Sequence, residues 1–125
     1  MPQGTTYYKT TVVSVGAEAP DMAEGGVVIL FAEPVPEALA DVSVVHRPSH
    51  LLSAPIQPND TVDVAGQTLT ITAVGDIASD NLEQLGHVVL YVDQPDQKLL
   101  PGAVHASGTL TLPKPEQVIE FRSGS

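Results

Sequence analysis

Most apolar positions of this chain fall into short runs that have the alternation or the continuous apolar character of β-strands. Residues 5–16 (TTYYKTTVVSVG) are rich in β-branched and aromatic side chains, and residues 26–32 (GVVILFA) form a run typical of a strand covered on both faces. Residues 60–75 alternate and break at Ala65-Gly66-Gln67, which indicates a hairpin. Further strands are predicted over residues 41–46, 87–93, 104–112 and 117–121.

One segment, at about residues 79–86, is predicted to be helical. Leu82 and Leu85 are three positions apart and would share a helix face. Gly86 suits the left-handed position that commonly ends a helix. A helix of about one and a half turns is too short to be stable alone, so we expect it to pack on the strands.

The 11 prolines gather between the predicted strands, where they mark loops and edges because proline cannot donate to a strand ladder. In particular, the strand that ends at His46 is followed by a loop bounded by Pro48 and Pro58. Many short strands with such turn signals predict an all-β fold, either a small β-barrel or a two-sheet sandwich, with one short helix. A length of 125 residues suits a single domain over residues 1–125.

Composition and charge exclude several classes of function. The chain has no cysteine, which excludes disulfides, cysteine nucleophiles and cysteine-ligated metal sites. No apolar run approaches the roughly 18 residues of a membrane span and the N-terminus lacks signal-peptide character, so we expect a cytoplasmic protein without membrane insertion. A net charge of −10 argues against nucleic acid and is compatible with a basic protein partner.

The histidines are the most reactive groups in the sequence: His46, His50, His87 and His105. His46 ends a valine-rich strand just before the proline-bounded loop, where a side chain can be held rigidly and still face solvent. Arg47 beside it would favour a bound anion if both side chains faced the same way. For each histidine the simpler interpretation is a partly buried imidazole that hydrogen-bonds to the backbone.

Two other kinds of site are weaker. His46 and His50 are four positions apart, but Pro48 lies between them and no acid is adjacent, so a metal-dependent barrel enzyme is the least favoured hypothesis. A catalytic serine triad has no support, because the chain contains no Gly-x-Ser-x-Gly segment.

Several segments resemble one family. ITAVGDIASDNLEQLGHVVLYVD (71–93), LPGAVHASG (100–108), VVHRPSH (44–50) and TTVVSVGAEA (10–19) are similar to the glucitol/sorbitol-specific enzyme IIA component of the bacterial phosphotransferase system (PTS). The combination of D-N-L-x-x-L-G-H-V with P-G-x-V-H is specific, and the resemblance covers nearly the whole chain.

This resemblance implies a phosphocarrier, that is, a phosphotransferase component without a cofactor. His46 would accept a phosphoryl group from phospho-HPr and pass it to the IIB/IIC permease components for hexitol uptake, with His87 and His105 in supporting roles. The chain departs from the family pattern at Pro48, where a second histidine is expected. The alternative is a non-catalytic β-module that binds a partner and has lost the relay. The oligomeric state is left open, a homodimer included.

The phosphocarrier hypothesis makes a geometric prediction. His46 should lie in a shallow depression with one imidazole nitrogen accessible and a second histidine within a few ångströms. A buried His46 with both nitrogens bonded to the backbone would argue against it.

Overall fold

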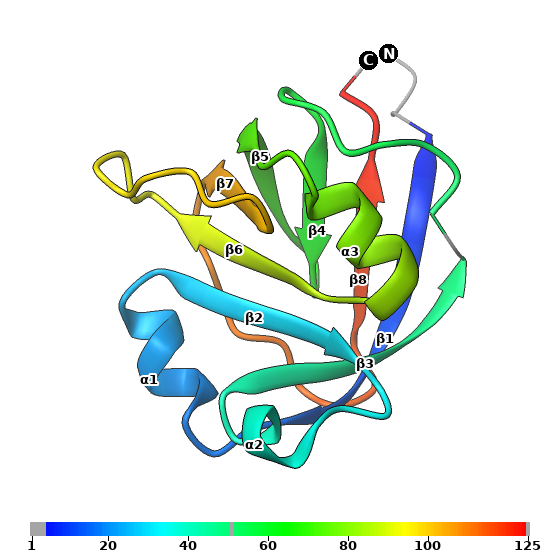
Figure 1. Cartoon of the computed structure of the whole chain (residues 1–125), viewed down its shortest axis with the longest axis vertical. Helices are drawn as coiled ribbons and strands as arrows, with labels where there is room; N and C mark the ends of the chain where they lie inside the picture. Colours follow the sequence, from blue (N-terminus) through cyan, green and yellow to red (C-terminus); the bar gives the residue numbers. More distant parts are fainter. Residues whose placement is uncertain (1–4, 51, 125) are drawn as a thin grey trace.

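Eight strands of the described chain close into a β-barrel in the computed structural model (Figure 1). The structure describes residues 5–50 and 52–124, without the side chain of His50. The strands are β1 (Thr6–Val15), β2 (Val27–Ala32), β3 (Ser43–His50), β4 (Thr61–Val64), β5 (Gln67–Val74), β6 (Val88–Val92), β7 (Ala103–Ser107) and β8 (Val118–Arg122). Their order around the barrel is β1-β3-β2-β6-β7-β5-β4-β8, so the barrel alternative of the sequence prediction is the one confirmed.

Two pairs of neighbouring strands, β2 with β3 and β6 with β7, are parallel, and the other pairs are antiparallel. The antiparallel pairing of β1 with β3 contains two register shifts, one between Lys9 and Thr10 and one between Val12 and Ser14. Such bulges change the direction in which a strand presents its side chains. The short stretch of β1 between them lies opposite His46.

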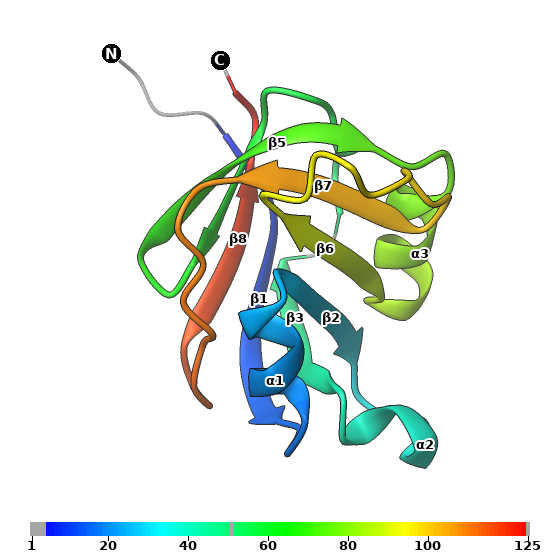
Figure 2. The ribbon, with the colours of Figure 1, turned by 90° about the vertical axis from the view of Figure 1, so that its left-hand side faces the viewer.

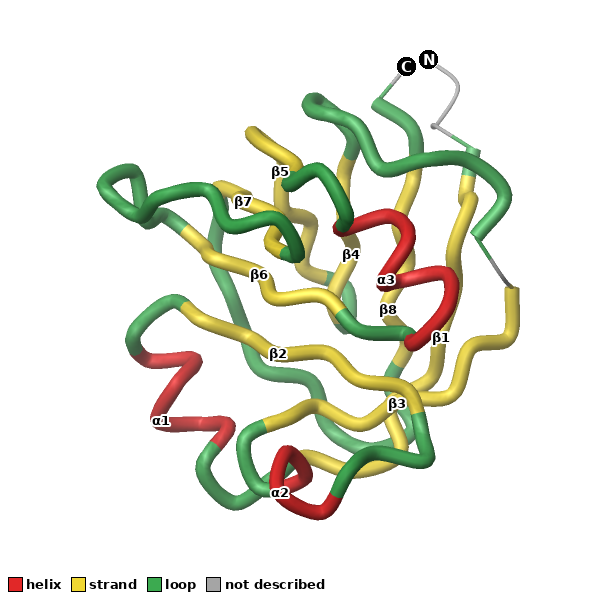
Figure 3. The backbone as a smooth tube through the Cα atoms, viewed as in Figure 1, coloured by secondary structure: helices red, strands yellow, loops and turns green. Residues whose placement is uncertain are grey.

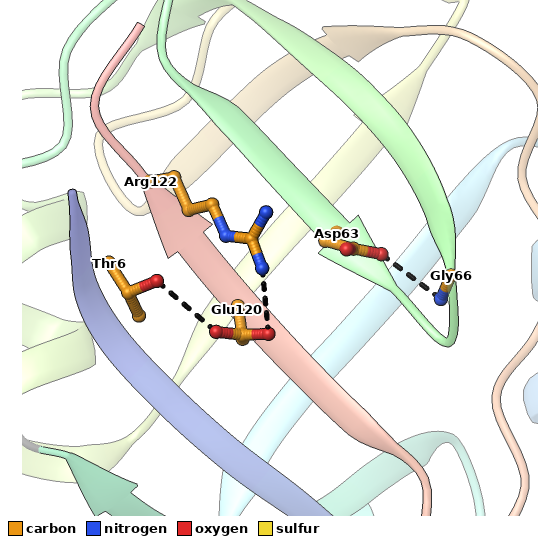
Figure 4. Close-up of polar contacts among 5 residues, drawn as sticks. All are labelled: Thr6, Asp63, Gly66, Glu120 and Arg122. Carbon is orange, nitrogen blue, oxygen red and sulfur yellow. Dashed lines mark hydrogen bonds and ion pairs between the residues drawn. The ribbon is translucent and has the colours of Figure 1, made fainter. Parts of the chain in front are cut away.

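The hairpin predicted at Ala65-Gly66-Gln67 joins β4 to β5. Ala65 and Gly66 both have positive φ, 51° and 89°, which is the requirement of the tight type I′ turn. Asp63 stabilises this turn by accepting a hydrogen bond from the Gly66 amide at 3.0 Å (Figure 4).

Alternation along the strands separates the barrel interior from its surface. Tyr8 and Phe121 meet inside at a ring-centroid distance of 5.9 Å and are almost fully buried. On the outer side, Glu120 of β8 accepts hydrogen bonds from Thr6 and Arg122 (Figure 4). The largest fully buried aliphatic side chains come from four strands and one helix: Leu30, Leu69, Ile71, Leu82, Leu90 and Ile119.

The described part of the chain also has three short helices, which lie outside the strands (Figures 2 and 3). α3 (Ala78–Leu85) confirms the helix predicted at about residues 79–86, and its Leu82 is buried in the core whereas Leu85 is 49% exposed. α1 (Ala19–Glu24) and α2 (Glu37–Ala40) were not predicted, because six and four residues are too few for an apolar period to show. None of the helices within the described residues is long and apolar enough to cross a membrane.

The end of β3 corrects the sequence prediction. The strand does not stop at His46 but continues through Pro48 to His50. Its pairing with β2 ends at His46, opposite Ala32, so beyond this point β3 pairs with β1 alone. Pro48 is tolerated because a strand with one free edge does not need every backbone N–H.

Candidate functional site

His46 points into the barrel and its side chain is completely buried. It shares the inward face of β3 with Val44, which belongs to the core, and both have an exposed fraction of 0%. The neighbouring strands place Val12 of β1 and Ala32 of β2 directly beside it. The ring of Tyr8 packs edge-on against the imidazole at a centroid distance of 6.4 Å.

Both imidazole nitrogens of His46 are hydrogen-bonded. Nε2 lies 2.6 Å from the carbonyl oxygen of Gly86, and Nδ1 lies 2.5 Å from Oγ1 of Thr10. A carbonyl oxygen can only accept, so Nε2 must carry a proton. In the neutral ring Nδ1 then has the lone pair and accepts from the Thr10 hydroxyl. These two contacts fix the tautomer of His46.

Burial keeps this imidazole neutral. Loss of hydration lowers the pKa of His46 below its usual value, and the hydrogen bond to Gly86 opposes this shift only in part. A neutral imidazole is the form that can act as a nucleophile. The neutral state of the ring therefore suits group transfer, although the ring is not accessible from the surface.

The residue whose carbonyl bonds to the His46 imidazole must be a glycine. It ends α3 in the left-handed conformation with φ of 63°, as the sequence predicted for a residue that terminates a helix. A Cβ at this position would also lie 2.3 Å from the Cβ of Ala32. Glycine thus allows the end of the helix to pack on β2, and this packing brings the Gly86 carbonyl to His46.

A cavity of about 430 Å³ is lined in part by Gly86. Its wall includes Tyr8 and Gly86, which contact His46, and Ala32, which pairs with His46 across β2 and β3. Pro48, two residues after His46 on β3, is also part of the wall. The remaining wall comes from the β2 end and from the last turn of α3: Phe31, Glu33, Pro34, Leu82, Glu83, Gln84 and Leu85. His46 itself is not among the residues that line this cavity, whereas its contacts Gly86 and Tyr8 are.

The predicted accessibility of His46 is wrong for this conformation. The ring lies inside the barrel instead of in a surface depression, because β3 turns the face that carries Val44 and His46 toward the core. One of its two partners is a backbone carbonyl and the other is a hydroxyl. The arrangement therefore differs from an imidazole bonded only to the backbone, and one side of the ring faces the peptide that bounds the cavity.

His87 follows Gly86, and its described side-chain contacts are with β2. Its Nδ1 lies 3.0 Å from the carbonyl oxygen of Leu30, and its ring packs on Phe31 at 4.6 Å. Among the described contacts, no hydrogen bond or ring contact joins it to His46.

His105 lies in a different part of the barrel, on β7. Its ring packs against Tyr91 at 5.5 Å, and its Nε2 is buried without a hydrogen-bond partner among the described residues. It lines a second cavity, of about 380 Å³, together with Thr72 and Asp93. The described contacts do not bring His105 to His46.

The remaining candidates are placed as follows. Arg47 points to the surface, where its Nε donates to Glu33 at 2.6 Å. This pair leaves the arginine 71% exposed and away from the imidazole. The side chain of His50 is outside the described atoms, and elsewhere in the described chain no three His, Cys, Asp or Glu side chains gather as a metal-ligand set.

Sequence reasoning missed Thr10, Tyr8 and the Gly86 carbonyl as neighbours of the imidazole. A signal for Thr10 was present, because Tyr8, Thr10 and Val12 alternate and share one face of a strand. A threonine between two large inward side chains is a buried hydroxyl that needs a partner.

Comparison with known proteins agrees with this architecture. The family model described as PTS system glucitol/sorbitol-specific IIA component matches residues 7–120. The chain belongs to this family. The PTS glucitol/sorbitol-specific EIIA components of Shigella flexneri and Escherichia coli (strain K12) are each 33% identical to it over 120 residues, which cover 95% of this chain and 97% of theirs.

The crystal structure of a PTS system IIA component from Enterococcus faecalis V583 has the same fold. Its TM-score is 0.75 at 21% identity, over 91% of this chain and 98% of that one. Membership of the glucitol/sorbitol IIA family makes this chain a phosphotransferase component that takes part in phosphoryl relay.

Proposed function

We propose that this IIA component carries the phosphoryl group on Nε2 of His46. It would accept the group from histidine-phosphorylated HPr and pass it to the IIB component that serves glucitol/sorbitol uptake. The observation that carries the proposal is the direction of the ring. Nε2 faces Gly86, which lines the cavity, whereas Nδ1 faces the fully buried Thr10.

The transfer requires the other tautomer of the imidazole. Attack on phosphorus needs a lone pair on Nε2, so the proton must lie on Nδ1. The hydroxyl of Thr10 can accept from Nδ1–H as readily as it can donate to a bare Nδ1. Thr10 therefore remains a hydrogen-bond partner in both tautomers.

The reaction balances without an external acid or base. An Nε2–P bond forms as the N–P bond of the donor histidine breaks. The proton on Nδ1 stays with the ring of His46, and the donor imidazole leaves with its own ring proton. Because the transition state for phosphoryl transfer is loose, alignment of the two rings and stabilisation of charge provide most of the catalysis.

The structure is a closed state with respect to this reaction, since the Gly86 carbonyl occupies the position of the incoming phosphorus. Opening requires this carbonyl to turn away from Nε2. Gly86 follows the last residue of α3 and precedes β6, so it is outside both regular elements. A glycine at such a junction can change φ and ψ with little steric cost. The exposed Leu85 beside it offers an apolar contact by which a docked partner could favour the open state.

The acidic surface fits a basic docking partner. The net charge is −10, and Glu33 and Glu83 lie on the cavity wall. Complementary charge raises association rates and makes them sensitive to salt. We further propose that the relay takes place in the cytoplasm, where the other soluble carriers act.

Labelling of the protein tests the assignment. Incubation with phosphoenolpyruvate, enzyme I and HPr should add one phosphate that is labile in acid and stable in base. His46→Gln should abolish this label, while His87→Gln and His105→Gln should keep the acceptor. Nitrogen–phosphorus coupling measured on the ¹⁵N-labelled protein should place phosphorus on Nε2. Full labelling of the His46 variant would disprove the proposal.

The variants His87→Gln and His105→Gln also separate supporting roles from acceptance. A slower transfer in either one, with full labelling at the end, would assign it a supporting role. Retained HPr binding without any label in the wild-type protein would favour a binding module instead.

A further inference from the structure

The hydroxyl of Tyr8 is a buried polar group without a hydrogen-bond partner. The side chain is 1% exposed, and its oxygen contacts no donor or acceptor within the described residues. Burying an unpaired hydroxyl is unfavourable, and phenylalanine would fill the same space without this cost. The presence of tyrosine at this position therefore suggests that its hydroxyl forms a hydrogen bond to a group that is absent from the resting protein.

The location of Tyr8 indicates which ligand this is. Its ring packs edge-on against His46, and the residue lines the cavity that Gly86 also lines. Tyr8 lies two positions before Thr10 on β1, and alternation places both side chains on the inward face of the strand. Tyr8 therefore belongs to the same buried group as the imidazole and is also part of the cavity wall.

The chemistry of the cavity makes a neutral donor valuable. Among its described wall residues there are two carboxyl groups, Glu33 and Glu83, and no lysine, arginine or histidine. Arg47, the cationic residue next to His46 in the sequence, is paired with Glu33 at the surface. The cavity also meets the C-terminal end of α3, where backbone carbonyls disfavour an anion. A phosphoryl group that enters needs a hydrogen-bond donor.

Tyr8 can provide this donor. Burial raises the pKa of its hydroxyl above the usual value, so the group keeps its proton. A donor that is already held in place by packing needs no reorganisation when charge arrives. The ring is fixed by Phe121 on one side and by His46 on another.

We propose that Tyr8 Oη–H donates a hydrogen bond to an oxygen of the phosphoryl group on His46. This inference rests on the proposed function. Tyr8 keeps its proton throughout, and it forms and breaks no covalent bond. Its contribution is to stabilise the negative charge of the transferred group and of the phosphohistidine that results.

The test is Tyr8→Phe, which removes only the oxygen. Because this oxygen is unpaired in the resting protein, the variant should be at least as resistant to urea as the wild type. Transfer from phospho-HPr should slow by about tenfold or more, toward the 10²-fold that removal of one preorganised donor typically causes. The phosphorylated variant should hydrolyse faster, and its ³¹P resonance should shift relative to wild type.

Tyr7→Phe is the matched control, since the neighbouring tyrosine bonds to Asp60 and does not line the cavity. It should lower stability and leave the ³¹P resonance unchanged. A Tyr8→Phe protein with wild-type transfer rate, hydrolysis rate and ³¹P resonance would overturn the inference, and would indicate that the hydroxyl serves only a bound water.

Two further results complete the design. If Tyr8→Phe does not fold, fluorotyrosine incorporated at position 8 keeps the shape and strengthens the donor, and it should slow hydrolysis of the phosphoprotein. An unchanged hydrolysis rate would then overturn the inference. If the His46→Gln variant still takes up phosphate, both the proposed function and this inference are disproved. If His46→Gln takes up no phosphate but Tyr8→Phe transfers and hydrolyses at the wild-type rates, only the role of Tyr8 is disproved.

Discussion

The carbonyl oxygen of Gly86 accepts a hydrogen bond from Nε2 of His46 at 2.6 Å, and Gly86 also forms part of the cavity wall. One peptide group thus connects the end of a helix, the buried imidazole and the cavity. It holds the proton on Nε2 and occupies the space that a phosphoryl group would need. The position of this peptide therefore controls both the tautomer and the accessibility of the ring.

Substitution of Gly86 by alanine should destabilise the protein. The left-handed conformation costs a non-glycine residue about 1–2 kcal/mol, and the new methyl group would also collide with Ala32. Gly66→Ala is the control, because Gly66 also has positive φ but has no neighbouring atom within 4 Å of the added Cβ. Urea unfolding should show a larger loss for Gly86→Ala. Equal losses would mean that the contact with Ala32 relaxes freely.

Removal of the Thr10 hydroxyl should weaken both the fold and the relay. Thr10→Val keeps the shape of the side chain but leaves Nδ1 of His46 without a partner, which costs roughly 1–3 kcal/mol. Thr10→Ser retains the hydroxyl and should restore phosphoryl transfer. The ¹⁵N shifts of the imidazole should report a less defined tautomer in Thr10→Val alone. An unaltered ring spectrum in that variant would contradict the contact.

Stability should depend on pH through His46. Burial lowers the pKa of this residue, so below its usual value of about 6.5 the unfolded chain binds a proton that the folded protein excludes. The contribution is complete above pH 6.5 and is lost as the pH falls below that value, with a limiting slope of about 1.4 kcal/mol per pH unit. The difference between wild type and His46→Gln, measured by urea unfolding at several pH values, isolates this slope. A constant difference between pH 7 and pH 5 would show that the ring titrates normally.

Tyr7 and Asp60 should contribute to stability independently of the imidazole. The Tyr7 hydroxyl donates to Oδ2 of Asp60 at 2.8 Å, and Asp60 also accepts from the amides of Gln57 and Gly124. Tyr7→Phe removes one of these bonds in a buried place and should cost about 1–3 kcal/mol. Thermal unfolding should show this loss, whereas Thr6→Val on the outer face should change stability less. A stable Tyr7→Phe protein would show that the other donors suffice for Asp60.

Much of the barrel was predictable because its strands carry local signals. The β-branched residues of β1, the apolar run of β2 and the turn at Gly66 each identified an element without knowledge of the others. Gly86 identified the end of α3 for the same reason. α1 and α2 had no such signal, since they are shorter than the period that would reveal them.

The burial of His46 was not predictable from its own segment. Val44 and Val45 are both buried although they point to opposite faces, so the apolar pattern did not tell which face of β3 was the interior. The two partners of the imidazole, Thr10 and Gly86, are 36 and 40 residues away in the sequence. Only the strand order brings them together. The resemblance to the IIA family made His46 the candidate for phosphoryl transfer, and the tertiary structure shows its tautomer and its burial.

Two register shifts in the pairing of β1 with β3 flank the stretch of β1 that meets the imidazole. Thr10 is fully buried, whereas Thr11 is only half-buried and belongs to the opposite face. A slip of β1 by one residue between these shifts would bring Lys9 or Thr11 to the position that Thr10 holds beside the ring. The surroundings of His46 therefore depend on the number of residues in the paired segments of β1 and β3 as much as on the identity of any one of them.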